Sequence, residues 1–242
     1  MAELIYTDCK MYVGGYDVSG YHTQTKLDHK QELHETTCLD DAARTRTTGL
    51  QSVDISSSGN WEATDTDTPF FTGLATNDQE ITICPDGNAA GDLALFTQGV
   101  QADYNIGGPV GELVPYDIVA HGCGGYGLAR GEVLANVSGA LTGVSTSTKR
   151  EITTEAVNTV YAILHVTSVS GTSPTLDVLV QSDANTDAEG ETTRITFPQI
   201  GAVGSAFGTP VTTMTEDFWR LSYTVGGSDT PTFSFIVAIA IF

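Results

Sequence analysis

Residues 159–183 read TVYAILHVTSVSGTSPTLDVLVQSD, and this stretch decides the fold class. Apolar side chains occupy every second position from Val160 to Val166 and again from Leu176 to Val180. Successive side chains of a strand point to opposite faces, so each half predicts a strand with one apolar face. Gly171 lies between the halves, where a turn needs a positive φ. We therefore predict two antiparallel strands of a β-sandwich.

The same alternation marks strands in the rest of the chain. The clearest buried faces belong to residues 219–225 and 233–241, which Gly226 and Gly227 separate. Further strands are predicted at residues 4–13, 26–36, 49–61, 80–84, 93–97, 110–120 and 128–136, the last two as a hairpin. One short helix is predicted from Asp67, as its capping residue, through Pro69 to about Gly73. The predicted fold class is all-β.

The chain is long enough for two β domains. Residues 134–148 are rich in Ser, Thr, Gly and Ala, which is typical of a connection between domains. We therefore predict one β domain at residues 1–147 and a second β-sandwich, jelly-roll or immunoglobulin-like, at residues 148–242. At 242 residues, either domain can bury a core of its own.

Charge excludes one large class of function. The chain holds 30 acidic and 10 basic residues, a formal charge of −20, of which −14 falls in residues 1–147. Tight DNA binding depends on cations that displace phosphate counterions, so sequence-specific DNA binding is disfavoured. The excess of acid also agrees with a surface made for solubility, or for a saline habitat.

Cysteine spacing and the first ten residues predict synthesis in the cytosol. Four cysteines are scattered without a close pair, and residues 1–10 do not look like a secretory signal. The apolar run at 233–242 is far shorter than the ~20 residues of a membrane helix, so no membrane partner is predicted.

No motif in the chain predicts catalysis, a metal or a cofactor. The glycine clusters do not open a helix after a parallel strand, and no Gly-x-Ser-x-Gly elbow is present. His29 and His34 differ by an odd number and would face opposite sides of a strand. Residues 183–189 resemble the start of a calcium loop but lack its glycine and final glutamate, so a solvated turn is predicted. His165 is interpreted as a packed or hydrogen-bonded side chain.

Several landmarks in the first 140 residues occur in an order that resembles the tail tube (major tail) proteins of long-tailed bacteriophages. They are YVGGYDVSG at 12–20, TT at 36–37, DAAR at 41–44, GLQSV at 49–53, GNW at 59–61, VGEL at 110–113 and RGEV at 130–133. The second half, with residues 161–166, 176–183 and 219–220, is similar to a β-sandwich module fused to some phage tail proteins.

This resemblance implies a virion protein without catalytic activity. Its copies would form rings, usually hexameric, or trimeric if the second domain is also tube-like. Stacked rings would make a hollow tail tube through which the genome passes without specific binding. The implied protein partners are further copies of the chain, the tape measure, the tail terminator and the baseplate or tip.

Two sets of site residues follow for such a tube. Strand alternation makes Asp28, Glu32 and Asp54 the candidates for the channel wall, where carboxylates would keep DNA from adhering. The loop near residues 38–48 is the candidate for ring stacking. Its charged residues are Asp40, Asp41, Arg44 and Arg46.

Two further functions stay open. A carbohydrate- or host-surface-binding sandwich would use Trp219 or Tyr223 as an exposed stacking platform, although alternation with Leu221 favours burial of Trp219. A capsid-decorating or head–tail joining protein would form one ring or cluster without stacking. An enzyme is the weakest alternative, because it would need two convergent titratable groups in a pocket.

Overall fold

The structure is a computed structural model that describes residues 8–40, 42–74, 76–139, 143–152, 158–186 and 190–242. It is all-β with one short α-helix, as predicted. The strands are β1 Lys10–Val13, β2 Tyr16–Asp17, β3 His22–Glu35, β4 Arg46–Asn60, β5 Gln79–Cys84, β6 Leu93–Ile106, β7 Pro115–Gly122, β8 Ala129–Val137, β9 Gly143–Thr146, β10 Arg150–Glu151, β11 Asn158–Asp183, β12 Thr192–Thr196, β13 Gly204–Phe207, β14 Val211–Met214 and β15 Phe218–Ile241. A π-helical turn, η1 Ala63–Asp67, leads into α1 Thr68–Gly73. No helix in the described ranges is long and apolar enough to cross a membrane.

The chain forms two compact units that interleave along the sequence. Unit 1 contains residues 1–20, 80–96 and 129–242, and unit 2 contains residues 21–79 and 97–128. The boundary predicted after residue 147 lies inside unit 1, where β8 pairs with β15 from Glu132↔Ile239 to Val137↔Phe235. A separate domain at 148–242 therefore stays a prediction, which expression of that segment would test.

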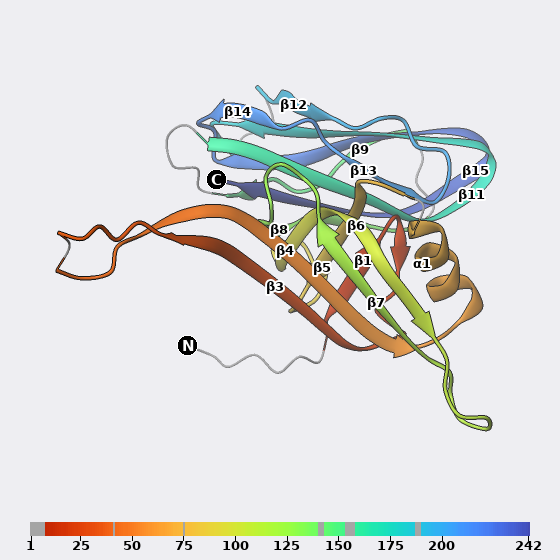
Figure 1. The fold of residues 1–242 in the computed structure, drawn as a ribbon. Coiled ribbons are helices and arrows are strands. Elements are labelled where there is room, and N and C mark those ends of the chain that lie inside the picture. Colours follow the sequence, from red (N-terminus) through yellow and green to blue (C-terminus); the bar gives the residue numbers. More distant parts are fainter. Residues whose placement is uncertain (1–7, 41, 75, 140–142, 153–157, 187–189) are drawn as a thin grey trace. The chain divides into compact units, whose positions relative to one another are not determined.

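A long ribbon of β11 and β15 forms the frame of unit 1 (Figure 1). The two strands pair antiparallel along their full length, from Val160↔Ile241 to Asp183↔Phe218. The predicted alternation of faces is confirmed, since Val160, Leu164 and Val180 are all buried. The pairing prediction is wrong, because the two halves of residues 159–183 are one strand whose partner is β15.

The expected turn is present as a bend of this ribbon. The ladder shifts register between Ser170 and Thr175, and Gly171 adopts φ +105° beside it. Opposite, Gly227 adopts φ +123°. Only glycine reaches such angles without steric cost. The bend allows both halves of the ribbon to contribute side chains to one apolar core.

The bent ribbon makes two layers of a sandwich. In one layer β13 and β14 extend the first half of β11, and β8 extends β15. In the other, β12 pairs with the second half of β11, while β9 and β10 pair with β15. The largest fully buried side chain is Trp219. Its indole Nε1 donates to the Glu216 carbonyl oxygen at 3.1 Å.

The first layer continues through β8, β6, β5, β1 and β2, and β5 and β1 return to β11 through side-chain contacts without strand pairing. At the point of return, the Thr82 hydroxyl lies 2.8 Å from His165 Nε2, and the Tyr12 ring stacks on the same imidazole. Burial of His165 lowers its pKa to about 3, because the charged form would lose its solvation. His165 is thus a packed, hydrogen-bonded residue, as the sequence indicates.

Unit 2 is a sheet in the order β3, β4, β7, β6, with α1 on one face. Phe70 of α1 is fully buried against Tyr104 and Tyr116, and the Gln101 amide donates to the Phe70 carbonyl oxygen at 2.8 Å. The predicted pairing of residues 110–120 with 128–136 is wrong, because β7 pairs with β4 and β6.

The helix near Pro69 is confirmed with Asp67 at its N-cap position, but the Asp67 side chain does not cap it. Asp67 has helical dihedral angles and makes no capping hydrogen bond. Its carboxylate instead accepts hydrogen bonds from Tyr104 and Trp61. Glu62 caps the preceding turn by accepting from the backbone N–H groups of Thr64 and Asp65, both at 2.7 Å. A side chain five residues earlier thus does the work expected of Asp67.

Candidate assembly surfaces

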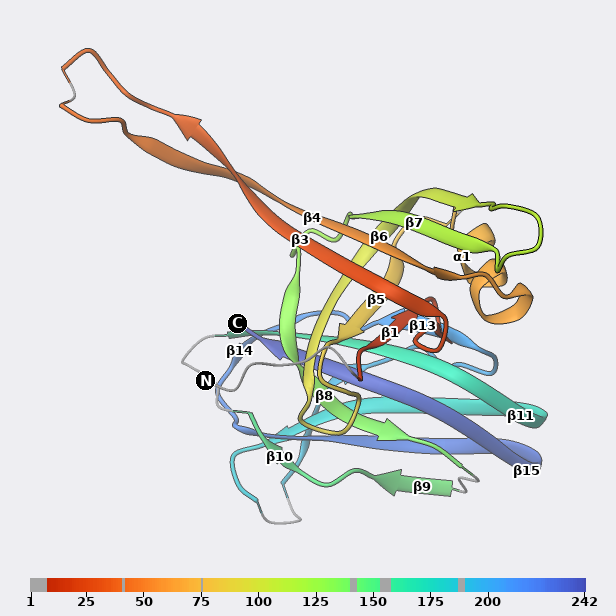
Figure 2. The same ribbon diagram turned by 90° about the horizontal axis from the view of Figure 1, so that it is seen from below.

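The hairpin of β3 and β4 extends beyond the other strands of unit 2 (Figures 1 and 2). Its strands pair from His22↔Gly59 to Glu35↔Arg46, but β4 meets β7 only from Asp54 to Asn60. We call residues 30–52 the arm. Every described side chain from residue 30 to residue 48 is exposed. The arm is therefore a two-stranded ribbon with solvent on both faces.

The predicted stacking residues lie at the far end of this arm. Asp40 and Arg44 are in the connection between the strands, and Arg46 begins β4; all three are exposed. Asp41 is outside the described residues. Among the residues with described positions, neither arginine forms an ion pair. Two cationic groups are thus available to a partner at this end of unit 2.

Two of the three predicted wall residues meet on the outer face of the sheet. Asp28 lies directly opposite Asp54 in the β3–β4 register, and Lys30 Nζ is 3.5 Å from a carboxylate oxygen of each. The neighbours of this pair on β4, Val53 and Ile55, are buried on the opposite face. The outer face is therefore polar, whereas the inner face packs on the core of unit 2.

Cations balance these carboxylates, which the sequence analysis did not anticipate. A hydrogen bond from Lys26 Nζ, at 2.6 Å, holds the pKa of Asp28 below its usual value. His121 Nδ1, 2.8 Å from Asp54, does the same for the pKa of Asp54. Lys26 and Lys30 could have been found from their even spacing with Asp28. The contact with His121 depends on the β4–β7 register, which no local pattern contains.

Glu32, the third wall candidate, lies farther out on the arm. Its carboxylate is exposed and lies 3.4 Å from His34 Nε2. The ladder shifts register between Gln31 and Leu33, so Glu32 is beside an irregularity of the strand. Glu32 is thus separated from the Asp28–Asp54 pair and belongs to the arm.

Unit 2 also exposes apolar side chains at the connection between β6 and β7. We call residues 106–114 the β6–β7 loop. Ile106, Val110, Leu113 and Val114 are all exposed, Leu113 by 76%. We call the far end of the arm, with Leu39, Arg44 and Arg46, the arm tip. The register Asn60↔Pro115 places the β6–β7 loop at the end of β4 opposite to the arm tip. The arm has exposed leucines of its own, namely Leu33, Leu39 and Leu50.

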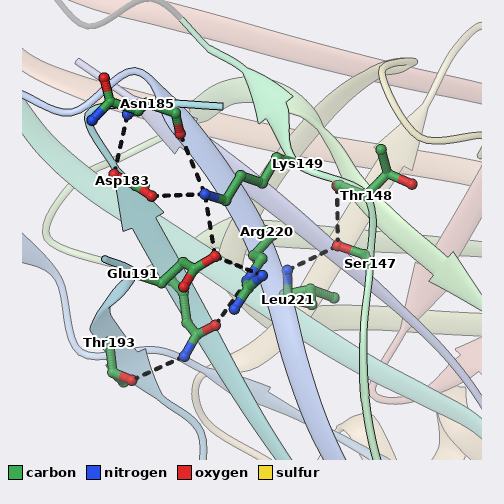
Figure 3. Close-up of polar contacts among 10 residues, drawn as sticks. Ser147, Thr148, Lys149, Asp183, Asn185, Glu191, Thr193, Arg220 and Leu221 are labelled. Carbon is green, nitrogen blue, oxygen red and sulfur yellow. Dashed lines mark hydrogen bonds and ion pairs between the residues drawn. The ribbon is translucent and has the colours of Figure 1, made fainter. Parts of the chain in front are cut away.

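Unit 1 contains a compact ion cluster (Figure 3), and a hollow lies beside it. Lys149 Nζ lies 2.7 Å from Asp183 and 3.1 Å from Glu191, and Arg220 lies 2.7 Å from the same Glu191 oxygen. Burial alone would lower the pKa of Lys149, but its bonds to the two carboxylates outweigh this and raise it. The hydrogen bond from Lys149 lowers the pKa of Asp183.

The neighbouring hollow has a volume of about 440 Å³ and is lined by Ser147, Thr148, Lys149, Glu151, Thr186, Phe218 and Arg220. Its two cations are already engaged by Asp183 and Glu191, so the cluster joins three parts of the chain and holds them in place. Asp183 begins the turn that resembles a calcium loop, and residues 187–189 of that turn lie outside the described positions. No group of three metal-ligating side chains is found among the residues whose placement is described.

The proposed sugar platform is absent from the positions expected for it. Trp219 has no exposed surface and Tyr223 is 7% exposed, because both rings face the core of the sandwich. An aromatic ring stacks on a sugar only where its face is accessible. The glycan-binding alternative therefore loses the two residues on which it was based.

Neither a protein-family model nor a curated protein matches this sequence. Several solved structures are similar in part. The tail of an empty gene transfer agent (GTA) particle is 16% identical, with 45% of this chain and 81% of that chain covered and a TM-score of 0.38. A chain of the native GTA virion is 15% identical, with 50% and 94% covered and a TM-score of 0.41. The SPP1 Dit (gp 19.1) protein, described as a hub adsorption apparatus protein of phages infecting Gram-positive hosts, is 11% identical, with 98% and 100% covered and a TM-score of 0.39. All three TM-scores are below 0.5, so the function proposed below rests on the residues of this chain.

Proposed function

We propose that this chain is a structural subunit of a phage tail and that its copies assemble into stacked rings forming the hollow tail tube. The order of the landmarks in residues 1–140 supports the family, and the arm supports self-assembly. The arm is the observation that carries the proposal, because it is the largest described segment without a core beneath it.

An isolated two-stranded ribbon is marginally stable in water, and an open strand edge invites pairing with another chain. The arm has both properties, since β3 pairs with β4 alone. Contact with a neighbouring copy would both stabilise the ribbon and cover its open strand edge. In a closed ring every copy has the same neighbours, so one such interface serves all of them. Six copies per ring is the number that the resemblance implies.

The outer face of unit 2 is the proposed channel wall, with Asp28 and Asp54 on it. Unit 2 contains 13 acidic and 4 basic residues, so phosphates that approach it are repelled overall. Lys26, Lys30 and His121 are held by these carboxylates and are poorly placed to displace counterions from DNA. Such a wall lets DNA pass without binding it. The tape measure, the tail terminator and the baseplate are the further partners that this role requires.

Removal of the arm tests the proposal. Lys30 pairs directly with Ser52, so residues 31–51 can be replaced by Asn-Gly, which forms a tight hairpin turn. The removed segment is exposed, apart from partly covered Gly49, and we expect the circular dichroism spectrum and melting temperature to stay close to those of the full chain. Sedimentation velocity should show large assemblies for the full chain and none for the shortened one.

The matched control is Val203→Ala, which changes an exposed apolar side chain of unit 1. This variant should assemble as the full chain does. If the shortened chain forms assemblies of the same size at the same concentration, the arm is not the assembly element and the proposal fails.

A further inference from the structure

We propose that the arm tip of one copy docks on the β6–β7 loop of the next copy along the tube, with Leu39 and Leu113 at the centre of the contact. This inference rests on the proposed function, since it names the surface that receives the arm. The interface is head-to-tail, because a different surface of each copy takes part.

The first reason is the position of exposed apolar side chains in unit 2. The arm exposes Leu39 completely and Leu50 by 82%, while the β6–β7 loop exposes Val110 completely and Leu113 by 76%. Scattered apolar residues on a surface are normal, but groups of them on two projecting segments mark interaction sites. Each group offers the other an apolar surface to bury.

The second reason is that one copy cannot bring the two groups together. The arm tip lies beyond the Arg46 end of β4, and the β6–β7 loop lies at the Asn60 end. β4 is 15 residues long, which corresponds to roughly 45 Å of strand. Another copy must therefore supply the partner. A head-to-tail contact closes into a ring or continues as a stack, depending on the rotation between copies, and a contact between successive rings continues along the tube.

The third reason is charge. A chain of formal charge −20 repels its own copies, so a stacking contact needs local attraction. Arg44 and Arg46 are exposed at the arm tip, and Glu112 is exposed in the middle of the β6–β7 loop. Residues 97–128 contain no lysine or arginine. The arm also carries Glu35, Asp40 and Asp41, so its far end is not positive overall, and the attraction is local: it comes from Arg44 and Arg46 meeting Glu112 on a loop without competing cations.

Cysteine cross-linking tests this contact, because Cys38 is exposed next to Leu39. The variant Leu113→Cys is made in a Cys123→Ser background, which removes the other exposed thiol. Assembled protein is treated with a short bis-maleimide and separated on a denaturing gel. We expect a ladder of linked chains. The matched variant Ser52→Cys places an exposed thiol at the base of the arm, away from the arm tip and from the β6–β7 loop, and it should give no ladder.

A charge exchange supplies a second readout. Arg44→Glu and Glu112→Arg should each raise the concentration needed for assembly by about tenfold, and the double variant should recover most of the loss. Assemblies that form normally but give no Leu113→Cys ladder, or an equal one with Ser52→Cys, would overturn the docking inference and leave the proposed function intact. Failure of the unmodified chain to assemble at all would instead remove the proposed function.

Discussion

Asp28 and Asp54 lie directly opposite each other on neighbouring strands, with one lysine, Lys30, between their carboxylates. Like charges directly across a strand pair repel, so this arrangement depends on the cations around it. On the proposed channel wall, the carboxylates of Asp28 and Asp54 are therefore paired with cations. The sequence analysis had predicted carboxylates without such partners.

NMR titration of the Asp28 and Asp54 carboxyl groups can test whether these cations are their partners. Lys26→Met should raise the pKa of Asp28, because the hydrogen bond from Lys26 is the largest influence that lowers it. The pKa of Asp54 should change little in this variant, since His121 is its main partner. His121→Gln should give the reverse pattern. Equal shifts of both carboxyl groups in both variants would show that the pairs are not formed as described.

The buried imidazole predicts a pH-dependent stability. The pKa of His165 is lowered to about 3 in the folded chain, against about 6.5 when unfolded. Between these values the unfolded state binds more protons, so stability falls as the pH falls from 6.5 toward 3. From pH 7.5 to 4.5 this one group should remove about 3 kcal/mol.

Urea unfolding at the two pH values measures this loss. His165→Gln keeps a polar partner for Thr82 but does not titrate, so its pH dependence should be weaker than that of the unmodified chain by about that amount. Gln31→Asn, at an exposed position of β3, replaces no titrating group and should leave the pH dependence unchanged. Identical slopes for His165→Gln and the unmodified chain would contradict the burial of a neutral imidazole.

The core of unit 1 should be sensitive at Trp219. This side chain has no exposed surface and packs among the residues of both layers. Trp219→Ala should lower the free energy of unfolding by about 3–5 kcal/mol, whereas Val144→Ala, on the exposed strand β9, should change it by less than about 0.5 kcal/mol. Thermal unfolding followed by circular dichroism compares the two. A small change in the free energy of unfolding for Trp219→Ala would contradict burial of this ring and favour its use as an exposed stacking platform.

The bend of the β11–β15 ribbon should depend on Gly227. Its φ is +123°, and a Cβ there would lie 3.0 Å from backbone atoms of Ser173 and Pro174. Gly227→Ala should therefore destabilise the chain by about 1–3 kcal/mol. Gly20→Ala meets no atom within 4 Å and should be neutral or slightly stabilising. Equal melting temperatures for the two variants would be inconsistent with a bend at this glycine.

The sequence indicates which side chains of a strand share a face, but it says little about which strand pairs with which. Alternation correctly assigned Val160, Leu176 and Trp219 to buried faces, because a strand's own period determines which side chains share a side. It did not reveal that one strand runs through residues 159–183, since a bend and a hairpin turn use the same residue types. The pairing of β11 with β15 joins residues up to 81 positions apart, and no local pattern specifies such a register.

For the candidate surfaces too, the sequence indicated which side chains share a face but not which residues they contact. Alternation alone indicates that Asp28 and Asp54 share a face, and Asp40, Arg44 and Arg46, three of the residues predicted for ring stacking, are exposed. The cations that balance the wall were missed at His121, and the ion cluster of Lys149, Asp183, Glu191 and Arg220 was missed entirely. Each of these contacts joins strands that are distant in sequence.

Self-assembly into a tube is the central claim, and electron microscopy of the purified full chain tests it most directly. At high protein concentration, negatively stained images should show long hollow tubes built of regularly stacked rings. A population of separate monomers that persists at every concentration would contradict the claim.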